Sequence, residues 1–237
     1  KLLPLEMMPK FSKIKIPKGQ GKRLGMNEHD YHQITQVSQR WHKQTKTPSH
    51  HYERQQLHNL ILIQSWYGTR TCETLGLKWS DVTFGKDGNA TINIREETTK
   101  RDKNRKVTGS RGDVFERIKS YSRHTNPDDH VFSSYHDGTL WNPYERWREL
   151  KEAVKEKYPD FNEKLSLYDL RHFFVSSRLR GGDSQWAISR YVGNSPEMIT
   201  KHYDNVTDEQ VSRGILSKRL KFVDGEVIAI PVTKDEP

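Results

Sequence analysis

Cysteine is nearly absent from this sequence, since Cys72 is the only one among 237 residues. A disulfide within the chain is therefore excluded, and a reducing compartment is expected. The sequence also lacks an apolar run long enough to cross a bilayer, and residues 1–10 show no signal-peptide pattern. We therefore expect a cytoplasmic protein that has no membrane partner.

Two kinds of cofactor site are missing as well. No glycine-rich loop of the type that cradles the phosphates of ATP occurs in the chain. His50, His51 and His58 lie near one another in the sequence but lack the clustered cysteine or carboxylate partners of a metal site. We accordingly expect no cofactor and no metal.

Positive charge is what the sequence has in excess. Its 40 Lys and Arg residues outnumber its 31 Asp and Glu residues, which gives a formal net charge of +9. Such an excess favours an anionic partner such as nucleic acid, and a merely soluble basic protein is the alternative. The 32% of hydrophobic residues still allow one large folded domain.

The spacing of apolar residues divides the chain into a mainly helical body between two short ends. Residues 1–25, rich in Lys, Gly and Pro, are typical of a basic interdomain linker that follows an upstream domain. Residues 91–95 and 105–108 alternate like the two strands of a hairpin across the charged turn 99–104. Asn27 and Ser49 are the candidate N-caps of the first two helices, of which the first is predicted to run through Trp41. Further helices are predicted over 113–123, 143–157, 166–180, 184–191, 196–203 and 208–220, and Gly181, Gly182 and Gly193 are suited to helix ends.

These elements predict an α+β fold that is mainly α-helical and contains a small antiparallel sheet. Residues 26–222 are interpreted as one domain. Residues 223–237 form a C-terminal tail, in which the apolar run 227–232 resembles a strand.

Three blocks of residues carry the chemistry. In the first, Arg70 is followed by Glu73, Leu75, Leu77, Trp79 and Asp81. In the second, Leu170, Arg171 and His172 lie in a helix that Gly182 ends. In the third, Gly193 lies eleven residues after Gly182, and Tyr203 lies nine residues after Asn194.

The arginines and the tyrosine of these blocks suit phosphodiester chemistry. Arginine stays charged, and its planar fork donates two hydrogen bonds to a phosphate. Arg70 and Arg171 could thus stabilise the charge that grows on a five-coordinate phosphorus. Tyr203, at the end of a short polar helix, is the expected nucleophile, because a covalent phosphotyrosine conserves the energy of the broken bond. Tyr191 is its nearest rival.

With all three blocks in this order and spacing, the chain resembles the catalytic domain of tyrosine recombinases, specifically phage-type integrases, over residues 27–206. The resemblance implies that fold. It also implies site-specific cleavage and rejoining of double-stranded DNA through a 3′-phosphotyrosine, for the integration or excision of a phage or mobile element. A homotetramer on DNA during synapsis is implied too, as is a location at the nucleoid of a bacterial host.

The resemblance also places a general-acid lysine in the predicted hairpin, seven residues before a valine. Lys100 has that separation from Val107 and is the expected proton donor to the departing 5′ oxygen. Lys103 is the alternative, and the segment could instead be a solvated basic turn that touches the DNA backbone.

Two candidate site residues depart from the family pattern. Tyr168 stands three residues before Arg171, where a histidine is usual, and Asn194 follows Gly193, where a histidine or tryptophan is usual. Both side chains donate hydrogen bonds, but neither is an imidazole. A catalytically weakened DNA-binding module of the same fold is therefore an alternative function, and a topoisomerase-like relaxing enzyme is a third.

The tail also has two interpretations. Residues 227–232 either dock onto a neighbouring subunit or add an edge strand to the sheet of their own chain.

Overall fold

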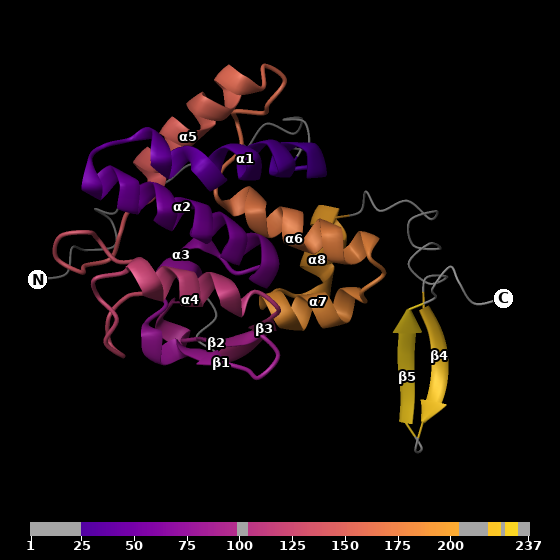
Figure 1. Ribbon diagram of the computed structural model, residues 1–237. Helices are drawn as coiled ribbons and strands as arrows, with labels where there is room; N and C mark the ends of the chain where they lie inside the picture. Colours follow the sequence, from indigo (N-terminus) through magenta and orange to yellow (C-terminus); the bar gives the residue numbers. More distant parts are fainter. Residues whose placement is uncertain (1–24, 99–103, 204–217, 224–225, 232–237) are drawn as a thin grey trace, which may run out of the picture.

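The computed structural model describes residues 25–98, 104–203, 218–223 and 226–231, and its side chains through residue 200. Most of these residues form a helical body in which α2 packs against α1, α4, α5 and α6 (Figure 1). The helices that build this body are α1 (Glu28–Trp41), α2 (Pro48–Tyr67), α3 (Thr71–Leu75), α4 (Gly112–Tyr121), α5 (Tyr144–Lys157) and α6 (Tyr168–Arg180). Short 3₁₀ turns are η2 (His42–Gln44), η3 (Trp79–Asp81) and η4 (Glu96–Thr98).

The first two helices begin at residues that are suited to a helix N-terminus. Asn27 caps α1, because its side chain accepts a hydrogen bond from the Asp30 backbone at 2.8 Å, as the sequence predicted. Helix α2 begins at Pro48, so its N-cap is Thr47 and not the predicted Ser49. Proline suits the first helical position because its missing N–H would have no partner there.

Helix α2 ends at Gly68, which has a left-handed backbone with φ of 61°. A Cβ atom at this residue would lie 2.3 Å from Cδ1 of Phe174, on α6. Only glycine therefore allows the left-handed turn and the close approach of α6 together. This contact fixes the end of α2 against the helix that carries Arg171.

A three-stranded antiparallel sheet lies beside the helices, with the order β1 (Val82–Phe84), β2 (Ala90–Ile94) and β3 (Arg105–Gly109). Ile92 pairs with Val82 on one side and with Val107 on the other, and the core side of β2 is fully buried. The predicted hairpin is confirmed as β2 and β3. Strand β1 and helix α3 were not predicted, because each is too short to show a period.

Helices α7 (Gln185–Val192) and α8 (Pro196–Tyr203) form a small lobe next to α6. Ser184 caps α7 by accepting a hydrogen bond from the Ala187 backbone at 3.1 Å, and Gly193 ends it with φ of 70°. The lobe has its own core, apart from the larger core of the body. That small core consists of Phe174, Val175, Leu179, Ile188, Val192 and Ile199.

The C-terminal strands β4 (Lys218–Val223) and β5 (Glu226–Pro231) pair with each other as an antiparallel hairpin. The expected strand near 227–232 is thus present, and in the described residues it pairs with β4 and not with the sheet of the body. The predicted helix over 208–220 is wrong at its end, because residues 218–220 belong to β4. Leu220 and Phe222 alternate with basic residues there, which is a strand pattern.

None of the described helices is both long and apolar enough to span a membrane.

Candidate active site at an arginine cluster

The site is built around Glu73, whose side chain is completely buried near the start of α3. Its carboxylate accepts a hydrogen bond from the Arg70 backbone at 2.8 Å and another from Arg70 Nη1 at 2.6 Å. The backbone bond arises because Glu73 lies three residues after Arg70 at a helix N-terminus, where a carboxylate satisfies a free backbone donor. The bond to the guanidinium is an ion pair between the same two residues. Glu73 therefore holds the guanidinium of Arg70 in one orientation.

The other terminal nitrogen of Arg70 points to the turn between α7 and α8. Its Nη2 donates to Oδ1 of Asn194 at 3.0 Å and to the carbonyl of Gly193 at 3.2 Å. The Arg70 side chain remains 14% exposed. The fold thus brings Arg70 and Asn194 together, although the sequence separates them by most of the chain.

Arg171, on α6, lies behind Arg70 and is almost closed to solvent, with only 1% of its side chain exposed. Its Nη1 donates to the carbonyl of Gly68 at 2.8 Å, and its Nη2 donates to the carbonyl of Val192 at 2.7 Å. Burial, followed by the charge of Arg70, lowers the pKa of Arg171 to about 10. The guanidinium is still charged at neutral pH, and each Nη retains a second N–H.

A third guanidinium, that of Arg105 on β3, completes the cluster. Its two terminal nitrogens bind the two oxygens of Glu73, at 3.1 Å and 2.7 Å. The sequence did not single this residue out. A signal was available, because Arg105 lies two residues before the buried Val107 and so shares its face of the strand. A charged residue on a buried face requires a buried partner.

In the described part of the chain, three positive charges thus surround one negative charge. Burial tends to raise the pKa of Glu73, but hydrogen bonds and charges from Arg105 and Arg70 outweigh it and lower that pKa below its usual value. Glu73 therefore stays ionised, and the cluster keeps an excess of positive charge. Such a cluster is chemically suited to an anion such as phosphate.

Of the remaining predicted site residues, one lies at the edge of this cluster, and the side chains of the others lie outside the part of the chain that the structure describes. Tyr168 begins α6 and is 42% exposed, with its ring edge-on to that of His172 at 4.9 Å. Tyr203 is the last residue of α8, but its side chain is outside the described part. Lys100 and its alternative Lys103 also lie outside the described residues.

The structure gives Tyr191, the rival nucleophile, a different role. Its hydroxyl donates to the carbonyl of Thr108 at 2.7 Å, and its ring stacks on Phe174 with centroids 5.6 Å apart. Burial raises the pKa of Tyr191 to about 12. Its phenol is thus held against β3 and has a structural role.

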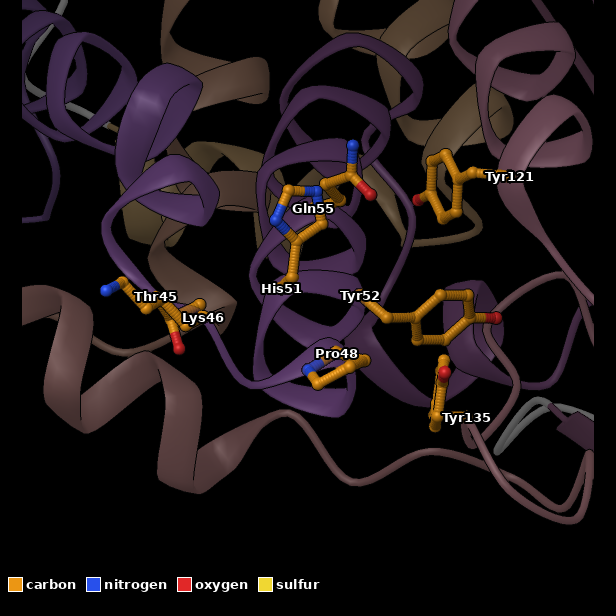
Figure 2. Close-up of a pocket in the computed structure, with 8 residues that line it drawn as sticks. All are labelled: Thr45, Lys46, Pro48, His51, Tyr52, Gln55, Tyr121 and Tyr135. Atoms are coloured by element: carbon orange, nitrogen blue, oxygen red, sulfur yellow. The ribbon is translucent and has the colours of Figure 1, made fainter.

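A separate pocket of about 500 Å³ lies at the start of α2, whereas the arginine cluster lies near the end of that helix (Figure 2). Tyr52, Tyr121 and Tyr135 line it together with Lys46 and His51. Helix α2 has 20 residues and is about 30 Å long, so this pocket is remote from the arginine cluster. It contains none of the predicted site residues. Within the described ranges, no group of three His, Cys, Asp or Glu residues could hold a metal ion.

Comparison with known proteins agrees with this architecture. The chain matches the Phage integrase family over residues 25–210. A comparison with curated protein sequences gave no match.

Three solved structures illustrate the likeness. The XerH site-specific recombinase, in a post-cleavage complex with a palindromic difH substrate, has a TM-score of 0.63 at 18% identity over 87% of this chain and 56% of its own. The Tn1549 transposon integrase with circular intermediate DNA has a TM-score of 0.64 at 14% identity, covering 85% of this chain and 67% of its own. The catalytic domain of bacteriophage HP1 integrase has a TM-score of 0.51 at 15% identity, covering 81% and 93%.

The fold is therefore that of tyrosine recombinase catalytic domains, and the predicted fold class is confirmed. The chain spans little more than half the length of the XerH recombinase that it resembles.

Proposed function

The chain belongs to the phage integrase family of tyrosine recombinases, and we propose that it cleaves and rejoins double-stranded DNA at specific sites through a covalent 3′-phosphotyrosine. The biological role would be integration or excision of a phage or another mobile element. The observation that carries the proposal is the convergence of Arg70 and Arg171 on Glu73 and on the turn at residues 192–194.

Arg70 is the guanidinium best placed to meet the scissile phosphate first. It is partly exposed, and its Nη2 now binds the amide oxygen of Asn194, which a phosphate oxygen can replace. A charge-assisted bond to an anion is stronger than one to a neutral amide. Asn194 can then turn its own amide N–H groups to the phosphate.

Arg171 would bind through the second N–H on each of its terminal nitrogens. Because it is covered, this contact needs a small displacement of the turn at residues 192–194, which a bound phosphate would stabilise. Both arginines would then oppose the charge that develops on the nonbridging oxygens, where it is largest in the transition state. Tyr168, exposed at the start of α6, supplies a further hydroxyl donor.

Tyr203 would supply the attacking oxygen. Its phenol releases its proton to water as the oxygen forms a bond to phosphorus, the bond from phosphorus to the 5′ oxygen breaks, and that oxygen takes a proton from Lys100. Rejoining is the reverse, with a 5′ hydroxyl attacking the phosphotyrosine. The bond energy stays in the covalent intermediate, so the cycle consumes no nucleotide.

The direct test is to trap that intermediate. The chain is incubated with a pool of nicked DNA duplexes of randomised sequence, and adducts that survive denaturant are recovered and sequenced. We expect adducts at a shared sequence, and none with Tyr203→Phe, which removes only the hydroxyl. DNA binding without an adduct would instead identify a catalytically weakened binding module, and relaxation of plasmids without a shared sequence would identify a topoisomerase.

The assignment of Lys100 has its own test. Replacing the bridging 5′ oxygen by sulfur provides a leaving group that departs without a proton. Lys100→Ala should then fail on ordinary DNA but cleave the sulfur substrate nearly as the parent chain does. Lys103→Ala is the matched control and should cleave both. Failure of Lys100→Ala on both substrates assigns the acid to another residue.

Assembly into a homotetramer on DNA during synapsis belongs to the same proposal. The hairpin of β4 and β5 would dock onto a neighbouring subunit. Removing residues 218–237 takes away the whole hairpin and should abolish synaptic complexes in gel electrophoresis while sparing binding to a single site. Intact synapsis in that truncated chain would show that the hairpin serves its own subunit.

A further inference from the structure

Arg105 is the one guanidinium of the cluster that takes no part in the steps above. We propose that Arg105 is a positioning residue, which occupies the Glu73 carboxylate and so keeps Arg70 directed at the scissile phosphate. This inference rests on the proposed function, because it concerns the same site.

The two arginines share Glu73 unequally. Arg105 binds it with its whole fork, through Nη1 to Oε1 at 3.1 Å and Nη2 to Oε2 at 2.7 Å. Arg70 uses one side-chain nitrogen only, Nη1 to Oε1 at 2.6 Å. The second terminal nitrogen of Arg70 is thereby left to reach Asn194. The carboxylate is filled by Arg105, and Arg70 faces outward.

Arg105 also holds the turn that carries Asn194. Its Nε donates to the carbonyl of Tyr191 at 3.3 Å. A Cβ atom at Gly193 would lie only 3.1 Å from Nη1 of Arg105, so the guanidinium packs directly on that glycine. One side chain thus connects β3, the start of α3 and the turn after α7. These are the segments that must be aligned for Arg70 and Asn194 to meet.

Charge explains what the loss of Arg105 would do. Glu73 is completely buried, and a buried carboxylate needs compensating charge. Among the described residues, the nearest cations without Arg105 are Arg70 at 2.6 Å and Arg171 at 3.8 Å. We expect Arg70 to turn its fork onto Glu73 and to give up the contact with Asn194. The carboxylate would then neutralise the positive charge of Arg70, which would no longer be available to a phosphate.

Two other roles for Arg105 predict different results. If Arg105 itself touched the phosphate, its loss could not be relieved by changing Glu73. If it only stabilised the fold, its loss would lower the melting temperature and the amount of folded protein but would leave the rate per folded molecule unchanged. Relief by removal of the Glu73 charge is specific to positioning.

The experiment therefore combines two substitutions. Arg105→Met removes the charge at similar side-chain length, and Arg105→Met with Glu73→Gln also removes the carboxylate that would capture Arg70. Single-turnover adduct formation is measured on a nicked duplex of the sequence recovered from the randomised pool, and thermal unfolding is followed in parallel. We expect Arg105→Met to lower the rate by about 10²-fold, the size typical of a lost transition-state donor. Adding Glu73→Gln should raise the rate of adduct formation about tenfold above that of Arg105→Met alone, as expected for strongly coupled neighbours.

Two controls make the result specific. Lys106→Met removes the same charge from the next residue of β3, which is exposed, and should leave the rate per molecule unchanged. Arg105→Lys keeps the charge without the fork and should lose less than Arg105→Met. If Arg105→Met does not fold, Arg105→Gln, whose amide NH2 group can still donate hydrogen bonds, replaces it in both arms.

A double variant no faster than Arg105→Met alone overturns the inference and leaves the proposed function intact. If the parent chain forms no Tyr203-dependent adduct, the proposed function fails separately. The same variants are then compared by their dissociation constants for a nicked duplex of fixed sequence. Arg105→Met should weaken that binding and Glu73→Gln should restore it, and absence of this pattern rejects the role of Arg105.

Discussion

The large core of the body and the small core of the α6 to α8 lobe differ in size and in what they hold together. The large core joins α1, α2, α4, α5 and the sheet through many fully buried side chains, among them Leu60, Phe115 and Phe132. Among the residues whose side chains the structure describes, the small core contains six buried apolar ones. The arginine cluster lies between the two, with Arg171 bonded to Gly68 on one side and to Val192 on the other.

This difference indicates how the site is positioned. Apolar burial is strong but has no direction, so it fixes the body without specifying the angle of a guanidinium. Hydrogen bonds to carbonyls and a carboxylate are directional, and here they attach the small lobe to the body. Stability should therefore depend mainly on the large core, and alignment of the proposed catalytic groups mainly on the junction and the small core.

The strongest test of the comparison is a cavity in the large core. Leu60→Ala should lower the free energy of unfolding by about 2–5 kcal/mol, because a fully buried leucine is replaced by a void. Urea denaturation measures this loss. Leu140→Ala, at a leucine that is 51% exposed, is the control and should change it by about 0.5 kcal/mol or less. Equal losses in the two variants would contradict the assignment of the core.

Acid should weaken the large core through His58. Burial, followed by the charge of Arg117, lowers the pKa of His58 to about 4, and its Nδ1 lies 2.9 Å from Oγ of Ser38. Below the ordinary histidine pKa of about 6.5, His58 binds a proton in the unfolded chain but not in the folded chain. The free energy of unfolding therefore falls as the pH drops from about 6.5 to 4.

The loss from His58 should be on the order of 3 kcal/mol. It is measured as the difference in unfolding free energy between pH 7 and pH 4.5, for the parent chain and for His58→Gln. The glutamine variant should lose less over this interval. The same pH dependence in both proteins would show that His58 does not cause it.

At the junction, Gly68→Ala should lower the free energy of unfolding by about 1–3 kcal/mol, because it combines left-handed strain with a Cβ 2.3 Å from Phe174. Adduct formation should fall as well, since the carbonyl of Gly68 binds Arg171. Gly88→Ala is the matched control: φ there is 71°, but nothing lies within 4 Å of the added Cβ. Gly88→Ala should lower the free energy of unfolding only by the cost of the left-handed backbone and should leave adduct formation normal.

The smallest change in stability gives the sharpest comparison. Ile199→Val in the small core and Ile61→Val in the large core each remove one methylene from a fully buried residue and should each cost about 0.5–1.5 kcal/mol. Only Ile199→Val, on the helix that carries Tyr203, should slow adduct formation, by about tenfold, because small misplacements of reacting groups are costly. Equal rates in the two variants would remove the distinction between the cores.

The sequence was informative wherever a local signal was sufficient. Asn27, Ser184 and Gly193 mark helix ends by their own chemistry, and the structure has the predicted ends there. The alternation in residues 91–95 identified a strand of the sheet, and the spacing of three blocks identified the family. It misjudged the chain near Lys218, where a basic alternating segment was assigned to a helix.

What the sequence by itself determined was the inventory: helices and a small sheet, and the candidate residues Arg70, Lys100, Tyr168, Arg171, Asn194 and Tyr203. Periodicity and capping depend on residues close together in the chain, so a short stretch of sequence is enough to reveal them. The tertiary structure alone decided that Glu73 is shared by three arginines, that Arg105 is one of them, and that Asn194 meets Arg70. These are contacts between distant segments, and a guanidinium takes its partner from the space around it and not from its neighbours in the chain.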